Sequence, residues 1–267
     1  MMPVHAGEDA AAVSERARDG LRWLQTEGEG WTVAFSTRHD GVSTGAFATL
    51  NIGLSVGDAP SAVLENRSRL VAVLGFRLDD LVVPGQVHGT RVAAVDERHR
   101  GRGARDRDTV VHATDALATT TPRLPLVVSF ADCVPVLIAA RGARGRIAIA
   151  LVHAGWRGML AGVVGATAEH LARLGTLSAA VVGPSIGPCC FTDADDVGRR
   201  FDDRFPGSRR DGSVDLWACA EAELAACDVP RVAIVNPRLC TSCDRRFYSH
   251  RRDGGRTGRQ AAVAWIG

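Results

Sequence analysis

The stretch from Leu126 to Gly158 reads LVVSFADCVPVLIAARGARGRIAIALVHAGWRG and decides the fold class. It contains three short apolar runs rich in Val and Ile, which predict buried strands over 126–130, 134–140 and 147–152. After His153 the chain passes through a glycine turn into a predicted helix, which Gly175 ends. The apolar positions of this helix share one face and are Leu160, Val163, Val164, Leu171 and Leu174. The stretch therefore indicates a β-sheet that carries a layer of helix.

Patterns of the same kind mark the rest of the chain. Apolar segments of strand length lie at 31–36, 81–83, 92–95, 179–182, 232–235 and 261–266. Amphipathic spacing predicts helices over 61–74, 193–205 and 215–227, and a weak helix over 10–24. Neither an internal repeat nor a linker interrupts residues 31–267. We therefore predict one α+β domain over 31–267, with mixed β-sheets flanked by helices, and a partly flexible N-terminal extension over 1–30.

The overall composition is that of an ordinary globular protein. The 267 residues are 46% hydrophobic and 23% charged. A net charge of +2 is too small to favour nucleic acid or a membrane surface as a partner. The arginine-rich segment 97–107 lacks the aromatic residues that bind single-stranded nucleic acid, and we interpret it as a solvated loop. No apolar run approaches the ~20 residues that a membrane-spanning helix needs.

The cysteines bear on the cellular location. The chain has seven, and its first 30 residues lack the apolar segment of a secretory signal. Free thiols in such a chain predict the cytoplasm, where they stay reduced and are available as metal ligands. The sequence contains no lysine, so arginine must perform any anion binding.

Three metal-binding side chains each stand at the end of a predicted strand. His88 follows the strand 81–83 and a short turn, Cys133 lies between two apolar runs, and His153 closes the run 147–152. A single His or Cys in such a place is more often a core residue, but three at successive strand ends indicate a site. One thiolate and two imidazoles suit Zn²⁺, and three protein ligands leave a fourth position open, as in catalytic zinc sites.

The segment from His153 to Gly158 gives a second indication of a site. A strand that runs into a glycine-containing turn and a helix start presents free backbone N–H groups and the positive end of a helix dipole. Such a position suits a phosphate or a developing oxyanion, with Arg157 as a bidentate partner. The alternative interpretation is that the glycines only permit tight packing.

The remaining cysteines are less informative. Cys189 and Cys190 are adjacent, and Cys240 and Cys243 form a C-x-x-C pair. A structural four-cysteine zinc site normally uses two separated C-x-x-C hairpins, and adjacent cysteines are poor partners on one ion. We therefore expect no second metal site there. Cys219 and Cys227 lie on a predicted helix and are expected in the core.

A series of motifs over residues 31–267 resembles one family of proteins. The motifs are Ser36-Thr37-Arg38, Leu50-Asn51-Ile52-Gly53, Asn66-Arg67, Gln86-Val87-His88-Gly89, Ala131-Asp132-Cys133-Val134-Pro135, His153-Ala154-Gly155-Trp156-Arg157-Gly158, Gly183-Pro184-Ser185-Ile186-Gly187-Pro188-Cys189-Cys190, Ser249-His250-Arg251-Arg252-Asp253-Gly254 and Thr257-Gly258-Arg259-Gln260. In this order they are highly specific. The sequence resembles the laccase-domain proteins, long named polyphenol oxidases and later assigned purine nucleoside chemistry, including peptidoglycan-editing members.

The resemblance carries expectations about fold and activity. It implies a laccase-like catalytic domain similar to that of the cytotoxic necrotising factors. It also implies a zinc ion bound by His88, Cys133 and His153, phosphorolysis of adenosine, inosine and methylthioadenosine, and deamination of adenosine. The partners would be purine nucleosides and phosphate, bound by a monomer or homodimer.

Roles for individual residues follow from combining the resemblance with the side-chain chemistry. We expect Cys133, His153, Asp132 and Arg157 to act in catalysis, with Asp132 supporting the metal ligands or moving protons. Asn51, Arg67 and Arg251 are expected to bind substrate. Two positions differ from the usual pattern, because the loop 141–146 is long and His250 replaces a residue that is often aromatic.

Two other functions use the same residues. Cys133 as nucleophile and His153 as base would make a hydrolase or amidase acting on peptidoglycan precursors. A copper polyphenol oxidase would bind copper instead of zinc, but multicopper sites use many histidines, often in His-x-His pairs. The chain has eight histidines and no such pair, and only Met159 is near in sequence as an axial ligand. A non-catalytic binding protein poorly explains three ligands at strand ends.

Overall fold

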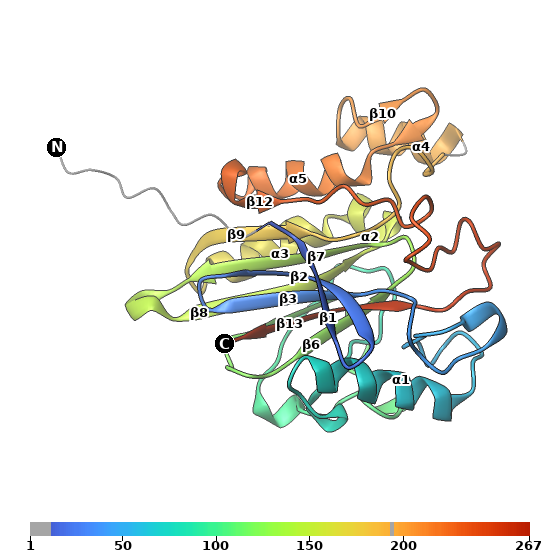
Figure 1. Cartoon of the computed structure of the whole chain (residues 1–267). Coiled ribbons are helices and arrows are strands. Elements are labelled where there is room, and N and C mark those ends of the chain that lie inside the picture. Colours follow the sequence, from blue (N-terminus) through green and yellow to red (C-terminus); the bar gives the residue numbers. More distant parts are fainter. Residues whose placement is uncertain (1–11, 193–194) are drawn as a thin grey trace.

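The computed structural model describes residues 12–192 and 195–267. Two β-sheets pack against each other, and helices cover the outer face of each sheet (Figure 1). The predicted α+β class, a single domain of mixed sheets flanked by helices, is confirmed. The likeness to the necrotising factors stays a prediction.

The first sheet has five antiparallel strands in the order β1-β2-β3-β13-β6. Their bounds are Ser14–Arg18 for β1, Leu21–Gly28 for β2, Trp31–Ser36 for β3, Leu126–Phe130 for β6 and Gln260–Ile266 for β13. The last strand of the chain thus lies inside the sheet, between β3 and the edge strand β6.

The second sheet has six strands in the order β12-β9-β7-β8-β5-β4. Its strands are β4 (Val92–Ala94), β5 (Ala116–Thr119), β7 (Val134–Arg141), β8 (Ile147–Ala154), β9 (Thr176–Val182) and β12 (Ile234–Val235). The pairs β4–β5 and β9–β12 are parallel and the others antiparallel, so the sheet is mixed. A separate small hairpin joins β10 (Arg209–Arg210) to β11 (Ser213–Val214).

Alternating side chains of β7 and β8 enter two different cores. Leu137 and Leu151 pack between the two sheets, together with Phe35 of β3. Their neighbours Val136 and Val152 pack against the helices on the other face. Both faces of these strands are buried, which is why their sequences are continuous apolar runs instead of alternating patterns.

Helices complete the layers. α1 (Pro60–Val73) packs on the first sheet, and α2 (Trp156–Ala161), α3 (Val163–Ala172) and α5 (Leu216–Ala226) pack on the second, with α4 (Asp195–Arg204) beside them (Figure 1). Single turns of 3₁₀ helix lie at Gly45–Phe47, Leu78–Asp80, Glu97–His99, Arg107–Thr109, Ala143–Gly145 and Arg231–Ala233. No helix in the described part of the chain is long and apolar enough to span a membrane.

The helix predicted after His153 is divided in two. Gly162 separates α2 from α3 in the left-handed conformation, at a φ of 89°. A side chain there would collide with the guanidinium of Arg204, because an added Cβ would lie 2.7 Å from its Nη2. The division lets α2 diverge from α3 directly after the Gly155 junction that follows β8.

The helix predicted over residues 10–24 is wrong for the described residues. Residues 14–28 form β1 and β2, and β2 pairs with β3 over six residue pairs. Leu21 and Trp23 face the α1 layer, whereas Leu24 faces the core between the sheets. The spacing of these three apolar residues fits the period of a helix as well as that of a strand. Pairing with β3 makes the segment a strand. The predicted flexible extension otherwise falls on residues 1–11, which lie outside the described residues.

Candidate metal centre and active site

The strands of both sheets bring the predicted ligands to one end of the molecule. β6 ends at Phe130 and β7 begins at Val134, so Cys133 lies in the short loop between the two sheets. His153 is the penultimate residue of β8, where it pairs with Pro135 of β7. Neighbouring antiparallel strands thus place Cys133 beside His153, as the sequence predicts.

A buried carboxylate holds both histidines in place. Asp115 is fully buried and directly precedes β5, the strand next to β8. Its Oδ1 accepts a hydrogen bond from Nδ1 of His153 at 2.9 Å. The same carboxylate accepts the backbone N–H groups of the three residues Val87, His88 and Gly89, at 2.8–3.1 Å. His88 has a φ of 61°, in the left-handed region. The three hydrogen bonds from the loop to Asp115 stabilise this conformation.

Hydrogen bonding to Asp115 also fixes the tautomer of His153. A carboxylate accepts hydrogen bonds, so Nδ1 carries the hydrogen and Nε2 remains free to bind a metal ion. Burial raises the pKa of Asp115, but the hydrogen bonds from His153 and the backbone outweigh it and lower that pKa below its ordinary value. Asp115 therefore stays ionised and orients the ligand.

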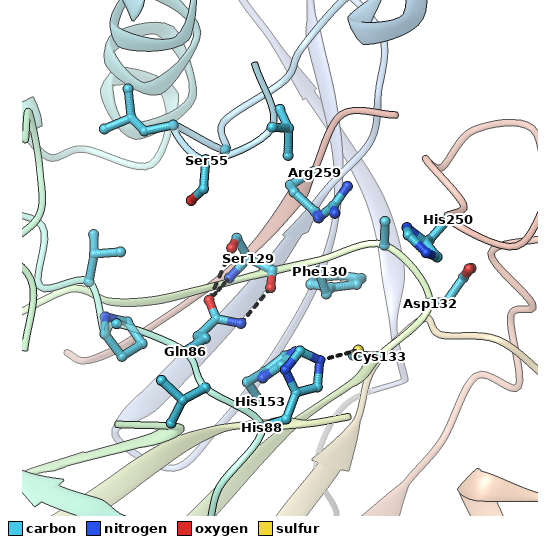
Figure 2. Close-up of a pocket in the computed structure, with 18 of the residues that line it drawn as sticks. Ser55, Gln86, His88, Ser129, Phe130, Asp132, Cys133, His153, His250 and Arg259 are labelled. Atoms are coloured by element: carbon cyan, nitrogen blue, oxygen red, sulfur yellow. Dashed lines mark hydrogen bonds between the residues drawn. The ribbon is translucent and has the colours of Figure 1, made fainter. Parts of the chain in front are cut away.

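The three candidate ligands converge on one point. Sγ of Cys133 lies 3.8 Å from Nε2 of His88, and the His88 and His153 rings meet edge to face with centroids 4.9 Å apart. The ligand atoms of all three residues lie within 4.8 Å of one another. Figure 2 shows the three side chains together at one end of a pocket.

Gly155 leaves the space that this convergence needs. A Cβ added at Gly155 would lie 2.3 Å from Cδ2 of His88 and 3.2 Å from Sγ of Cys133. The residue has a φ of −67°, which any amino acid adopts, so conformation does not require glycine here. The requirement is the close approach of the His88 ring and the Cys133 thiol.

Without a bound ion, Cys133 and His153 form a charged pair. Burial raises the pKa of the Cys133 thiol, but the charge of His153 and hydrogen bonds from both histidines outweigh it, lowering the pKa to about 6. Burial lowers the pKa of His153, but the Cys133 thiolate and Asp115 outweigh it and raise the pKa to about 9. The thiolate, which is the form that binds metals, is thus favoured at neutral pH.

This donor set fits a borderline-soft metal ion. Tetrahedral zinc, at about 2.3 Å from sulfur and about 2.0 Å from nitrogen, places those two atoms about 3.5 Å apart. The Cys133–His88 separation of 3.8 Å is close to that value. His88, Cys133 and His153 would hold the ion and leave one side of it open to the pocket. The same donors also bind copper, so the ligand set alone does not select the metal.

The pocket above the candidate ligands is large and positively charged. Its volume is about 770 Å³, within the usual range of about 300–1,000 Å³ for small-molecule sites. Among the described residues, those that line it include one acid, Asp132, and five arginines, namely Arg67, Arg107, Arg157, Arg251 and Arg259. Aromatic rings of Phe130, Trp156 and Phe191 add flat apolar surface. The lining suits a planar ligand that carries or reacts with an anion.

The predicted arginines are held in different ways. Arg157 has its guanidinium 4.3 Å from the ring centre of Trp156, at the start of α2. Arg251 donates from Nη1 to the carbonyl of Cys190 at 3.0 Å and to Thr192. Arg67 is buried and donates to three backbone carbonyls at 2.7–2.8 Å, which occupies Nε and Nη1.

Asp132 and Asn51 make mainly internal contacts. The Asp132 carboxylate accepts hydrogen bonds from Oγ1 of Thr241 and from the backbone N–H of Arg251, both at 2.7 Å. Asn51 is fully buried. Its Nδ2 donates a hydrogen bond to the Asp58 carboxylate, and its Oδ1 accepts one from the backbone N–H of Arg259. Asp132 lines the pocket, whereas Asn51 is absent from its lining in the described part of the chain.

Sequence reasoning missed three residues of the site. Asp115 follows no motif, and its strand β5 was not predicted. Arg259 lies above the ligands in Figure 2, and its charge interacts with Cys133 and Asp132. Gln86 fixes the His88 loop to β6 through hydrogen bonds to the backbone and hydroxyl of Ser129. Gln86 and Arg259 belong to the family motifs quoted above, and that membership was the signal in the sequence that could have identified them as site residues.

Comparison with known proteins identifies relatives over nearly the whole chain. The family described as multi-copper polyphenol oxidoreductase laccase matches residues 32–267. The purine nucleoside phosphorylase YlmD of Geobacillus stearothermophilus is 38% identical over 95% of this chain and 96% of its own length. The adenosine deaminase RL5, from an unknown prokaryotic organism, is 35% identical over 85% of this chain and 90% of its own length.

A solved structure agrees with the fold. The hypothetical protein YfiH of Bacillus licheniformis superposes with a TM-score of 0.86 at 32% identity, covering 95% of this chain and 99% of that one. The two-sheet architecture with its outer helices is therefore shared over the full length of that protein.

Proposed function

The chain belongs to the family described as multi-copper polyphenol oxidoreductase laccase, and from this premise we propose that it is a zinc-dependent purine nucleoside phosphorylase with adenosine deaminase activity. The proposed substrates are adenosine, inosine and methylthioadenosine, with inorganic phosphate. Relatives named for both activities support the proposal. The observation that carries it is the convergence of His88, Cys133 and His153 on an arginine-lined pocket.

Arg157 and Arg251 are the proposed phosphate ligands. Both are exposed side chains that line the pocket, and Arg157 makes no ion pair among the described residues. Arg251 is positioned by Thr192 and by the backbone contact between its N–H and Asp132. Arg67 also lines the pocket and stays a proposed substrate-binding residue. Its hydrogen bonds hold the loops around Ile52 and Gly103.

Asn51 and Asp132 have positioning roles in this proposal. Asn51 connects the loop at Gly53 to Arg259, which lines the pocket, so it acts on substrate through that arginine. Both oxygens of Asp132 accept short hydrogen bonds, one from Thr241 and one from Arg251. Through these two hydrogen bonds Asp132 orients the segment of Arg251 next to the ligand Cys133.

The aromatic lining provides the surface for a purine. Phe130 ends β6, three residues before the ligand Cys133, and Trp156 begins α2 next to Arg157. Phe191 packs against Arg251. Flat rings bury purine surface and prefer offset stacking. When bound by His88, Cys133 and His153, a zinc ion would supply a positive charge that polarises a substrate atom or a water molecule. The hydrogen bond to Asp115 holds the His153 ring with its Nε2 free to bind that ion.

Product analysis tests the proposal. Zinc-loaded protein is incubated with adenosine, with and without inorganic phosphate, and the products are separated by chromatography. Phosphorolysis joins a phosphate oxygen to C1′ and releases the base, so adenine and ribose 1-phosphate should form only with phosphate. Deamination adds water and releases ammonia, so inosine should form in both conditions.

Two variants give the controls. Cys133→Ala removes a ligand and should abolish both products, whereas Arg69→Ala, on the exposed face of α1, should leave both rates unchanged. Zinc-loaded wild type that yields neither adenine nor inosine contradicts the proposal.

A second candidate is supported by the geometry of Cys133, His153 and Asp115. A thiolate, an imidazole and a carboxylate that orients that imidazole are the arrangement of cysteine hydrolases. A hydrolase or amidase acting on peptidoglycan precursors would use Cys133 as nucleophile. Alkylation of Cys133 would then abolish activity, and chelators would have no effect. Loss of activity on chelation and its return with zinc would contradict this candidate.

The family description leaves a copper polyphenol oxidase as a third candidate. Within the described residues the two groups of potential ligands are His88, Cys133, His153 and a cluster of four cysteines. Neither group offers the many histidines of a multicopper centre. Near-stoichiometric copper with an intense blue absorption would favour this function over the nucleoside chemistry.

A further inference from the structure

Four cysteines converge at a second place, contrary to the expectation from sequence. Cys189 and Cys190 lie in the loop that follows β9, and Cys240 and Cys243 lie in the loop that follows β12. Their sulfur atoms all lie within 4.8 Å of one another. We propose that these four cysteines bind a structural zinc ion, independent of His88, Cys133 and His153 and of the reaction proposed above.

The distances between sulfur atoms fit one tetrahedral ion. Zinc bonded to four thiolates at about 2.3 Å places the sulfur atoms about 3.8 Å apart. Cys243 lies 3.6 Å from Cys189 and 3.4 Å from Cys190, measured between Sγ atoms. A disulfide needs about 2.05 Å, and the four thiols are free. Adjacent cysteines therefore do serve one centre here, because both side chains of the pair reach Cys243.

Backbone contacts hold the loop of Cys240 and supply a donor to its sulfur atom. The N–H of Gly187 donates to Sγ of Cys240 at 3.3 Å. The backbone N–H of Asp244 donates to the carbonyl of Cys240 at 2.8 Å and closes the C-x-x-C segment into a turn. The loop thus presents a preorganised pair of thiols, which suits a metal ligand better than an ordinary core cysteine.

Zinc is the ion that this environment favours. Thiolates select soft and borderline ions, and four of them in a tetrahedral cluster are typical of structural zinc. Cys189 and Cys243 are exposed while Cys240 is buried, so the cluster lies at the surface with one ligand anchored inside. An ion can enter from solvent, and no position is left open for a substrate.

The ion would join loops that build one wall of the pocket. The N–H of Thr241 donates to the carbonyl of Ser185, and the N–H of Ser185 donates to the carbonyl of Leu239. Thr241 also donates to Asp132, next to the ligand Cys133. The carbonyl of Cys190 accepts from Arg251, which lines the pocket. Loss of the ion should therefore loosen the Arg251 side of the pocket while leaving His88, Cys133 and His153 in place.

Metal analysis of single variants tests this inference. Wild type is prepared under reducing conditions with zinc supplied, and its zinc content is measured after gel filtration. We expect two equivalents per chain. Cys189→Ser and Cys243→Ser, which alter exposed side chains and should fold, should each lose one equivalent. Cys133→Ala should lose the other equivalent, and Cys227→Ser, a half-buried cysteine outside both clusters, should keep both.

Cobalt provides a second readout that does not depend on activity. Cobalt bound in Cys133→Ala should show the intense charge-transfer absorption of four thiolates, and the further change Cys243→Ser should reduce that absorption strongly. Unchanged zinc content in Cys189→Ser and Cys243→Ser would overturn the inference. One equivalent in wild type that Cys133→Ala loses and Cys189→Ser retains would also overturn it, as would mass analysis showing a disulfide within the cluster of the reduced, zinc-supplied protein.

Discussion

Asp115 accepts a hydrogen bond from Nδ1 of His153 at 2.9 Å while the other contacts of its carboxylate hold the backbone of His88. One buried group thus sets the orientation of two ligands that are 65 residues apart in the chain. The geometry of the metal site depends on this carboxylate as much as on the ligands themselves.

Replacement of Asp115 should weaken metal binding without removing a ligand. In Asp115→Asn the amide can accept at one oxygen only, so His153 loses its charged partner and the loop at His88 loses acceptors. Loss of such a partner typically costs 10–100-fold in metal affinity. Competition with a chelator of known affinity measures the effect. Asp108→Asn, at an exposed position, is the matched control, and equal affinity of the two variants would contradict the role of Asp115.

A methyl group at Gly155 should disrupt the site while leaving the fold intact. The backbone conformation accepts alanine, but the new Cβ would collide with the His88 ring. We expect Gly155→Ala to lose at least half of the metal bound at this site, with little change in thermal unfolding of the metal-free protein. Gly165→Ala is the control, because its Cβ would meet atoms no closer than 3.8 Å within helix α3. Normal metal content in Gly155→Ala would show that His88 has room to move.

The thiol of Cys133 should react as a thiolate at low pH in metal-free protein. Burial alone would raise its pKa, but the positive charge of His153 lowers it to about 6. The thiolate therefore persists above about pH 6 and is lost as the pH falls below that value. Alkylation by iodoacetamide, followed by mass spectrometry of the Cys133 peptide, measures the midpoint. In His153→Gln the lowering charge is absent, so the midpoint should move upward; an unchanged midpoint would exclude the pairing with His153.

Arg157 should distinguish the two proposed reactions. Phosphorolysis needs bound phosphate and deamination does not, so Arg157→Ala should raise the KM for phosphate about tenfold or more, as expected for loss of a charged hydrogen bond. The rate of inosine formation from adenosine should change less than about twofold, well below the effect of losing that bond. Arg69→Ala should change neither quantity. An equal loss of both activities in Arg157→Ala would indicate a general effect on the pocket instead of phosphate binding.

The parts of the fold that could be predicted are those buried on two sides. The runs 134–140 and 147–152 are apolar throughout because they face the sheet core and the helix layer in alternation. Five strands were missed, namely β1, β2, β5 and the two strands of the small hairpin, β10 and β11, and each depends on pairing with a neighbour. The apolar positions of β2 fit the spacing of a helix as well as that of a strand. β5 is only four residues long, and its partners β4 and β8 are distant in the sequence. Pairing across the sheet decides such segments, and a local pattern does not contain that information.

The same division applies to the site. The positions of Cys133 and His153 at strand ends could be predicted, since the ends of neighbouring strands meet in space. The strand predicted over 81–83 was wrong, because Val82 and Pro84 form only isolated bridges, and His88 lies in a loop. The part played by Asp115 could not, because it depends on β5 lying beside β8. The four-cysteine cluster was rejected on the spacing of its members, but the chain geometry lets both adjacent thiols reach Cys243. Contacts of Arg67 and Asn51 with backbone groups likewise follow only from the folded loops.

The central claim is that a metal ion held by His88, Cys133 and His153 is required for turnover of a purine nucleoside. Its most direct test is the metal content and adenosine turnover of wild type and Cys133→Ala, purified side by side with zinc supplied. We predict that Cys133→Ala lacks one zinc equivalent and forms neither adenine nor inosine, and that chelation of wild type abolishes both products until zinc is restored. Full metal content with sustained turnover in Cys133→Ala would contradict the claim.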